Sequence, residues 1–292
     1  MTSLRVSGFE YQRMDIGEVT INCAVGGSGP PVLLLHGYPQ NHLAWRHVAP
    51  ALTEGHTVVL ADLRGYGDSD KPAPDEAGIV YSKRAMARDQ VTLMLRLGFD
   101  SFQLVGHDRG ARVGMRLVLD HQQAVSRFAV LDVVPMHYAL RHLSLATVMN
   151  NYQWFFLPAG RGVPEHLIAA DPGFWVREQT AHLMGKGASI EPEVMDDYIR
   201  CFRDSDAIAA CCADFRAAPG IDLDHDDETV TAERKLECPV LVLWGTQSTV
   251  SDPVEVWQLY AADVRTESLP TGHFLPEEAP ELVSSALLQF LD

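Results

Sequence analysis

The chain has few basic side chains for its length: 23 Lys and Arg stand against 39 Asp and Glu in 292 residues, a formal net charge of −16. Nucleic-acid binding needs a basic surface that neutralises phosphates, so this class of function is excluded. Long apolar runs are also missing. The longest pure stretches, such as residues 32–35, are far too short to span a bilayer, and we expect no membrane segment.

Signals for export and for disulfides are missing as well. Residues 1–19 have no apolar central region of the kind found in signal peptides. An odd number of cysteines with no C-x-x-C pair predicts reduced thiols in a cytoplasmic protein rather than disulfides or a zinc site. They are Cys23, Cys201, Cys211, Cys212 and Cys238. No Cys/His cluster has ligand spacing, so we expect neither a metal nor an organic cofactor.

Apolar residues make up 47% of the chain, enough for a sizeable core. Short β-branched and Leu-rich runs predict buried strands of a parallel sheet, with helices between them. The expected strands are residues 32–35, 57–61, 102–105, 128–133, 240–244 and 266–269. The expected helices are residues 43–52, 84–97 and 111–121. This alternation is typical of an α/β fold with helices on both faces of a mostly parallel sheet.

Between residues 135 and 233 the strand signal disappears and the chain becomes helical and aromatic. Within it, the acidic stretch 222–228 predicts a solvated loop. Strand–helix alternation then resumes at Pro239. We therefore divide the chain into a first core part (1–134), an inserted helical cap (135–233) and a second core part (234–292).

The segment Gly106-His107-Asp108-Arg109-Gly110 lies between a predicted strand and a predicted helix, which is the context of a nucleophile elbow. Glycines suit its crowded backbone, and the turn presents the central side chain above the carboxyl edge of the sheet. That side chain is a carboxylate. It can attack an sp3 carbon bearing a leaving group and form an ester that water then cleaves. Asp108 therefore favours carbon–halogen or epoxide opening over ester hydrolysis; the structural alternative is a turn or helix N-cap residue.

His273 follows the last predicted strand, where a general base that activates water is expected. Two carboxylates could orient it. Asp132 ends an apolar strand, where an unpaired carboxylate is costly, and this favours Asp132 over Asp252. Ser248 stands after the strand 240–244, at a place where an Asp often lies.

Arg109 and Arg112 follow the nucleophile by one and four positions and share a helix face. Two guanidinium groups at this place favour binding of a carboxylate on the substrate, although surface ion pairs are an alternative. The backbone N–H groups of Tyr38 and Arg109 are the expected oxyanion donors for the tetrahedral intermediate on Asp108.

Together, His36-Gly37-Tyr38-Pro39, residues 62–69, the elbow, Asp132 and Gly272-His273-Phe274 resemble the haloacetate (fluoroacetate) dehalogenases of the α/β-hydrolase superfamily. Asp-Arg-Gly-x-Arg is the specific part, because related epoxide hydrolases and haloalkane dehalogenases usually carry Trp after the nucleophile. The resemblance implies an α/β-hydrolase fold and a homodimer. It also implies Asp108 as nucleophile, Asp132 as acid, His273 as base, and Arg109 with Arg112 as carboxylate ligands.

The resemblance further implies that a His, a Trp and a Tyr of the cap hold the leaving halide. The matching positions here are Gln153, Trp154 and Phe215, so only the Trp is kept. Packing within the cap is the alternative role for these side chains. Fluoride is strongly hydrated and needs donors that replace water, which Phe215 does not offer. We therefore expect chloroacetate and bromoacetate to be hydrolysed to glycolate and halide faster than fluoroacetate.

Other functions fit parts of this pattern. An epoxide hydrolase needs two cap tyrosines to protonate the opening oxygen, and the candidates are Tyr138, Tyr152 and Tyr198. A haloalkane dehalogenase is a second alternative. A ligand receptor on the same fold would bind a small molecule without turnover, but a complete set of catalytic residues argues against it.

Overall fold

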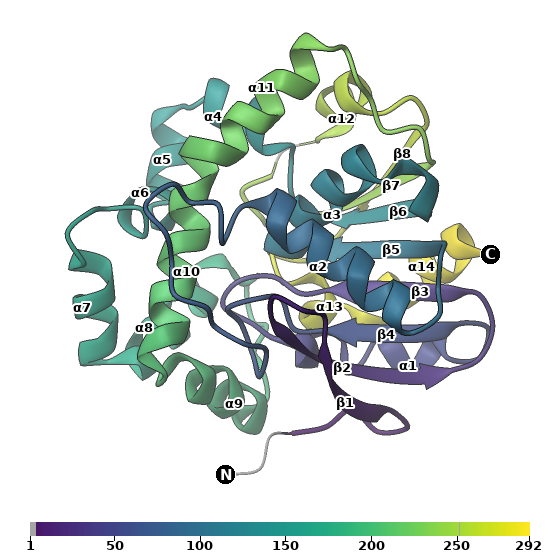
Figure 1. Ribbon diagram of the computed structural model, residues 1–292, viewed down its shortest axis with the longest axis horizontal. Coiled ribbons are helices and arrows are strands. Elements are labelled where there is room, and N and C mark those ends of the chain that lie inside the picture. The colour runs from purple at the N-terminus through teal and green to yellow at the C-terminus, as the bar shows by residue number, and fades with distance from the viewer. Residues whose placement is uncertain (1–3, 251) are drawn as a thin grey trace.

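The computed structural model describes residues 4–250 and 252–292 and shows one eight-stranded sheet between layers of helices (Figure 1). The strand order is β1-β2-β4-β3-β5-β6-β7-β8. β2 pairs antiparallel with both β1 and β4, and every pair from β4 to β8 is parallel. The strands are β1 (Glu10–Asp15), β2 (Thr20–Gly27), β3 (Pro31–Leu35), β4 (Thr57–Ala61), β5 (Phe102–His107), β6 (Val125–Leu131), β7 (Val240–Gly245) and β8 (Val264–Leu269).

Helices cover both faces of the sheet, which is why the central strands are continuous apolar runs. α2 and α3 pack against each other in front of the sheet in Figure 1, and α1 packs against α14. The core helices are α1 (Ala49–Leu52), α2 (Lys83–Arg96), α3 (Arg109–Asp120), α12 (Val254–Tyr260), α13 (Leu275–Glu278) and α14 (Pro280–Leu291). The expected α/β architecture is therefore confirmed.

Most expected elements differ from the observed ones at one end or both, and two of these differences have a local cause. The helix expected over residues 43–52 is a 3-10 turn, His42–Trp45, followed by the separate short α1. Pro50 explains the break, since a proline inside a continuous helix lacks an N–H and clashes with the preceding turn. The strand expected to reach residue 133 ends at Leu131, because Asp132 turns the chain with φ +53°.

The described regular elements between β6 and β7 are helices, and they form a layer beside one end of the sheet (Figure 1). They are α4 (Met136–Arg141), α5 (Leu145–Asn150), α6 (Gln153–Phe156), α7 (Val163–Ala170), α8 (Pro172–Leu183), α9 (Pro192–Phe202), α10 (Ser205–Ala217), a π-helical turn (Ala218–Asp222) and α11 (Leu223–Thr231). We keep the term cap for this segment. The division at residues 134/135 and 233/234 stays a prediction.

The acidic stretch 222–228 was expected to be a solvated loop, and this expectation is wrong. It forms the end of the π-helical turn and most of α11. Asp224 and Asp226 lie in the first turn of α11, where carboxylates favour the positive end of the helix dipole. Asp222 is buried and pairs with Lys83. Among the described residues, no helix is both long and apolar enough to cross a membrane.

Candidate active site

Asp108 stands in the tight turn between β5 and α3, with φ 47° and ψ −113°. The two glycines of the elbow are required by contact. A Cβ on Gly106 would lie 2.6 Å from the Cα of Ala111, and one on Gly110 would lie 2.4 Å from the carbonyl oxygen of Leu35. The turn is therefore packed against β3 and α3, which fixes the direction of the Asp108 side chain.

Two groups face the Asp108 carboxylate. The backbone N–H of Tyr38 donates to Oδ2 over 2.9 Å, and Nε2 of His273 lies 3.9 Å from Oδ1. The N–H of Arg109, in the first turn of α3, has no acceptor in the described part of the chain. Burial alone would raise the pKa of Asp108, but nearby His273, His107, Arg112 and Arg109 lower it. The carboxylate is therefore ionised at neutral pH.

Behind His273, Nδ1 lies 2.7 Å from Oδ2 of Asp132. Asp132 in turn accepts hydrogen bonds at Oδ1 from the N–H of Gly245 and the hydroxyl of Ser248, both over 2.9 Å. Burial opposes the imidazolium, but the hydrogen bond and charge of Asp132 raise the pKa of His273. Asp252 instead accepts from the N–H of Val254. Of the two candidate acids, the structure brings Asp132 to His273.

His107 carries no predicted role, yet it lies directly under the site. Its Nε2 is 2.8 Å from the carbonyl oxygen of His273, and the two rings are 4.8 Å apart. Burial, with the charge of His273, lowers the pKa of His107 to about 3, so the ring is neutral. Nε2 can then donate to that carbonyl and hold the loop that carries His273. His107 is part of the elbow motif in the sequence, but its contact with the His273 carbonyl is visible only in the fold.

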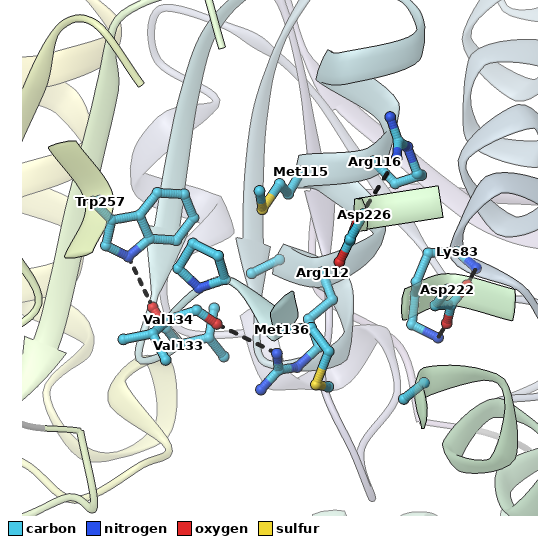
Figure 2. Close-up of a pocket in the computed structure, with 13 residues that line it drawn as sticks. Lys83, Arg112, Met115, Arg116, Val133, Val134, Met136, Asp222, Asp226 and Trp257 are labelled. Carbon is cyan, nitrogen blue, oxygen red and sulfur yellow. Dashed lines mark hydrogen bonds and ion pairs between the residues drawn. The ribbon is translucent and has the colours of Figure 1, made fainter. Parts of the chain in front are cut away.

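Arg112 lines the cavity into which Asp108 opens, and it is 8% exposed. Figure 2 shows its guanidinium beside Val134, whose carbonyl oxygen accepts from Nη1 over 3.3 Å. Nε has no partner, and no described carboxylate lies within 4.0 Å of the group. Burial and Arg109 lower the pKa of Arg112 to about 10, which leaves it charged at neutral pH. A buried cation without an anion is costly, so a bound anion would stabilise Arg112.

Arg109 is placed differently from Arg112. The residue is 1% exposed, and its guanidinium forms a bidentate ion pair with Asp214 of α10. Its Cζ also lies 4.3 Å from the centre of the Phe215 ring, and Arg109 lines an adjoining cavity that shares Trp154 and Phe215 with the cavity of Asp108. The two arginines therefore do not present equal charge to that cavity.

The cavity has a volume of about 340 Å³ and lies between the sheet edge and the cap. Gln153, Trp154 and Phe215, the three expected halide positions, all line it. Gln153 is buried and its Oε1 has no partner, while the ring of Trp154 lies 5.3 Å from the Arg112 guanidinium. The structure thus brings the expected halide positions and Asp108 to one cavity.

The three tyrosines considered for epoxide chemistry are separated. Tyr138 lines the cavity. The hydroxyl of Tyr152 accepts from Gln179, and Tyr198 donates to Glu277 over 2.6 Å. In residues 4–250 and 252–292, no group of three or more His, Cys, Asp and Glu side chains is arranged to hold a metal ion.

The fold and this site define a class of protein. The model of the α/β-hydrolase fold family matches residues 30–280, and the chain belongs to that family. A structure from Nostoc sp PCC 7120, provisionally described as an α/β hydrolase, has a TM-score of 0.96 and 45% identity, covering 98% of this chain and 99% of that one.

Curated relatives narrow the family. A fluoroacetate dehalogenase from Burkholderia sp is 44% identical over 97% of this chain and 94% of its own length. A soluble epoxide hydrolase from Corynebacterium sp. (strain C12) is 32% identical over 90% of this chain and 91% of its own. The chain belongs to the haloacetate dehalogenase family, whose members are hydrolases that act on carbon–halide bonds.

Proposed function

We propose that the protein hydrolyses haloacetates to glycolate and halide through an ester on Asp108. One observation carries the proposal: the ionised Asp108 and the unpaired, buried Arg112 line one cavity with His273. An anionic substrate held by Arg112 brings its own carbon within reach of the nucleophile. The 44% identity to a fluoroacetate dehalogenase supports the same class of substrate.

In the first step, the substrate carboxylate binds Arg112 and the free Nη1 of Arg109, and an Asp108 oxygen attacks the halogen-bearing carbon. The C–O bond forms as the carbon–halogen bond breaks, and the electron pair leaves with the halide. Trp154 and Gln153 line the cavity where the halide departs. Their N–H groups can donate to it, which replaces part of its hydration.

In the second step, His273 removes a proton from water, and the hydroxide attacks Cγ of the Asp108 ester. The N–H groups of Tyr38 and Arg109 stabilise the oxyanion, which the 2.9 Å hydrogen bond from Tyr38 N–H to Oδ2 supports. Asp132 stabilises the imidazolium that forms. Collapse of the intermediate breaks the ester C–O bond, the His273 imidazolium protonates the departing glycolate oxygen, and Asp108 loses the remaining proton to restore its carboxylate.

The halide positions support an order of reactivity. Phe215 offers no donor, and a neutral Gln153 replaces a residue that can carry charge. A lost donor to a developing anion costs on the order of 2–4 kcal/mol of barrier. We expect chloroacetate and bromoacetate to react faster than fluoroacetate. Initial halide release from the three acids at equal concentration measures this order, and fluoroacetate reacting fastest would overturn it.

A single turnover of chloroacetate in 18O-water tests the ester directly. The label should enter the Asp108 carboxylate, while the first glycolate carries oxygen from Asp108. Asp108→Asn should abolish steady turnover. Label appearing first in glycolate, with Asp108 unlabelled, would show direct attack of water on the substrate and refute the mechanism.

Epoxide hydrolysis is the second candidate, because the soluble epoxide hydrolase relative covers most of the chain. It is less well supported, since of Tyr138, Tyr152 and Tyr198 only Tyr138 lines the cavity. Turnover of styrene oxide with none of any haloacetate would favour it. Haloalkane dehalogenation is disfavoured because Arg112 is a cation in the cavity, and a haloalkane has no carboxylate to bind it. Multiple turnovers of any substrate would exclude a ligand receptor without catalysis.

Two further expectations belong to this proposal: a cytoplasmic location and a homodimer. The five cysteines are free and buried, as expected of a protein in a reducing compartment. The resemblance to the family supports the homodimer, and sedimentation of the purified protein tests it. A monomer at working concentration would remove this part of the proposal.

A further inference from the structure

Asp214 directly precedes Phe215 in the sequence, and it binds Arg109, the side chain next to the nucleophile. It lies in α10 of the cap and is 0% exposed. Its Oδ2 accepts from Nε of Arg109 over 2.7 Å, and its Oδ1 accepts from Nη2 over 2.6 Å. Its backbone oxygen accepts from the same Nη2 over 2.8 Å. This fork joins the cap to the elbow.

Two further donors hold the Asp214 carboxylate. The hydroxyl of Tyr66 donates to Oδ2 over 2.7 Å, and Nζ of Lys83 pairs with Oδ1. Burial would raise the pKa of Asp214, but Arg109 and Lys83 hold it well below its usual range. The carboxylate therefore stays ionised, and its position is fixed from the core side as well as from the cap.

This arrangement orients Arg109 in one way. Nε and Nη2 are committed to Asp214, and Nη1 is the nitrogen of that guanidinium without a hydrogen bond in the described residues. The Phe215 ring, beside the guanidinium, also lies 5.2 Å from the ring of Tyr38, whose N–H contacts Asp108. Asp214 therefore fixes the position of the Arg109 guanidinium, which in turn packs against Phe215 in the wall of the substrate cavity.

We propose that Asp214 is a positioning residue for recognition of the substrate carboxylate, acting through Arg109. It fixes the guanidinium plane so that Nη1 alone is left for the anion, while Arg112 supplies the uncompensated charge. The proposal rests on the proposed function, since it assumes a substrate with a carboxylate. It assigns no chemical step to Asp214, which touches neither substrate nor reacting atoms.

The first test is Asp214→Asn, which keeps the shape of the side chain but removes its charge. Released from the fork, Arg109 should bind the substrate carboxylate less well, while Asp108 and His273 are untouched. We expect the KM for chloroacetate to rise by roughly tenfold or more, with a much smaller change in kcat. Equal KM values in variant and wild type would overturn the proposal.

Asp222→Asn is the matched control. Asp222 is also a buried carboxylate partner of Lys83, at 3.4 Å, but Arg109 is bonded to Asp214 instead (Figure 2 shows the Lys83–Asp222 pair). It should alter stability and leave KM near the wild-type value. A rise in KM equal to that of Asp214→Asn would show a general effect of the buried network and overturn the positioning role.

A double-mutant cycle tests the route through Arg109. In an Arg109→Gln background, Asp214→Asn should raise KM no further. A further rise of the same size would show that Asp214 acts independently of Arg109, and the proposal would be wrong.

Binding of unreactive analogues separates this proposal from the proposed function. Asp214→Asn should weaken acetate binding by roughly tenfold or more, as measured by calorimetry, and leave acetamide binding unchanged. Unchanged acetate affinity would refute the positioning role even if haloacetates are substrates. Absence of halide release by the wild type would refute the proposed function, while the acetate comparison would still decide the role of Asp214.

Removing the charge of Asp214 alone leaves Arg109 without its acid partner and leaves Lys83 with Asp222 only, which can prevent folding. Lys83→Met/Asp214→Asn removes one cation together with the anion and keeps the local net charge. This double variant should show the same rise in KM and the same loss of acetate affinity. A folded double variant with wild-type KM would contradict the proposal.

Discussion

Ser248 donates a hydrogen bond to Asp132 over 2.9 Å. An acid that orients His273 could stand at either of these two positions, and in this structure their side chains are in contact. Asp132 follows β6 and Ser248 follows β7, the neighbouring strand. The carboxylate comes from one strand and the hydroxyl from the next. The place after β7 is therefore filled by a donor that supports the acid rather than by a second acid.

This relationship predicts the effect of Ser248→Ala. Asp132 would keep the N–H of Gly245 and His273 but lose one donor, so its orientation would relax. We expect decay of the aspartyl ester to slow by on the order of tenfold, with little change in its formation. Rapid-quench mass spectrometry of the enzyme with chloroacetate measures both rates. Equal slowing of both would show a general disturbance of the site.

The same relationship predicts that the acid can be moved. Asp132→Asn should slow ester decay by roughly a thousandfold or more and allow the ester to accumulate. Asp132→Asn/Ser248→Asp returns a carboxylate next to the lost one and should recover at least part of the rate. Asp132→Asn/Ser248→Asn is the neutral control, and recovery in that variant would show that charge is not the cause.

The pH dependence of ester decay follows from His273. The base must be neutral to accept a proton from water, and Asp132 raises its pKa above the ordinary value of 6.5. The decay rate should therefore increase with pH through a limb centred above 6.5 and then level off. Asp108 adds no limb to this step, since its carboxyl group is esterified while the intermediate decays. A limb centred below 6.5 would contradict this assignment, and Asp132→Asn should move the limb to lower pH.

Another prediction concerns Phe215 in the cap wall of the cavity. Phe215→Tyr adds a donor in the cavity where the halide departs, and its ring can keep the edge contact with Tyr38 at 5.2 Å. The rate with fluoroacetate should rise by roughly tenfold or more, and the rate with bromoacetate much less, because fluoride gains most from a donor. Fluoride and bromide release from the two acids measure the ratio.

Phe215→Leu is the control for this change, because it alters the same wall without adding a donor. It should not favour fluoroacetate over bromoacetate. If Phe215→Leu raised the ratio as much as Phe215→Tyr, cavity shape rather than hydrogen bonding would be responsible.

The elbow was visible in the sequence because all its signals are local. Within a few residues of Asp108 there are a strand, a helix and two glycines at which a Cβ would clash with neighbouring atoms. β1 was not expected for the opposite reason. Its sequence, EYQRMD, is polar and half exposed, so it lacks the pattern of a buried strand and depends on pairing with β2.

Pairings between distant residues could not be predicted in the same way. Arg109 and Asp214 lie 105 positions apart, and nothing near either residue indicates the other. The sequence therefore suggested that Arg109 and Arg112 are both carboxylate ligands. In the described structure, Arg109 has an acidic partner and Arg112 has none. The acidic stretch 222–228 misled for the same reason, since its basic partners lie on α2 and α3.

Asp226 provides the last prediction. Its side chain is 18% exposed and lies 3.7 Å from Nη1 of Arg116, beside Arg112 in Figure 2. Burial raises its pKa to about 6, whereas the unfolded chain has the ordinary value of 3.8. The folded state therefore binds this proton more tightly. The resulting stability is fully present below pH 3.8 and is lost as pH rises through 6.

At pH 8, Asp226→Asn should therefore raise the free energy of unfolding, by at most about 2–3 kcal/mol, because it removes a carboxylate that folding must bury in its charged form. At pH 5 the gain should be about half as large, since Asp226 is then protonated in the folded state but still ionised in the unfolded chain, and it should vanish only below pH 3.8. Urea unfolding at the two pH values measures the difference.

Asp227→Asn is the neighbouring control with the opposite sign: Arg141 lowers the pKa of Asp227, so this variant should destabilise the protein at pH 8. A loss of stability at pH 8 in Asp226→Asn would show that its pairing with Arg116 outweighs the cost of burial.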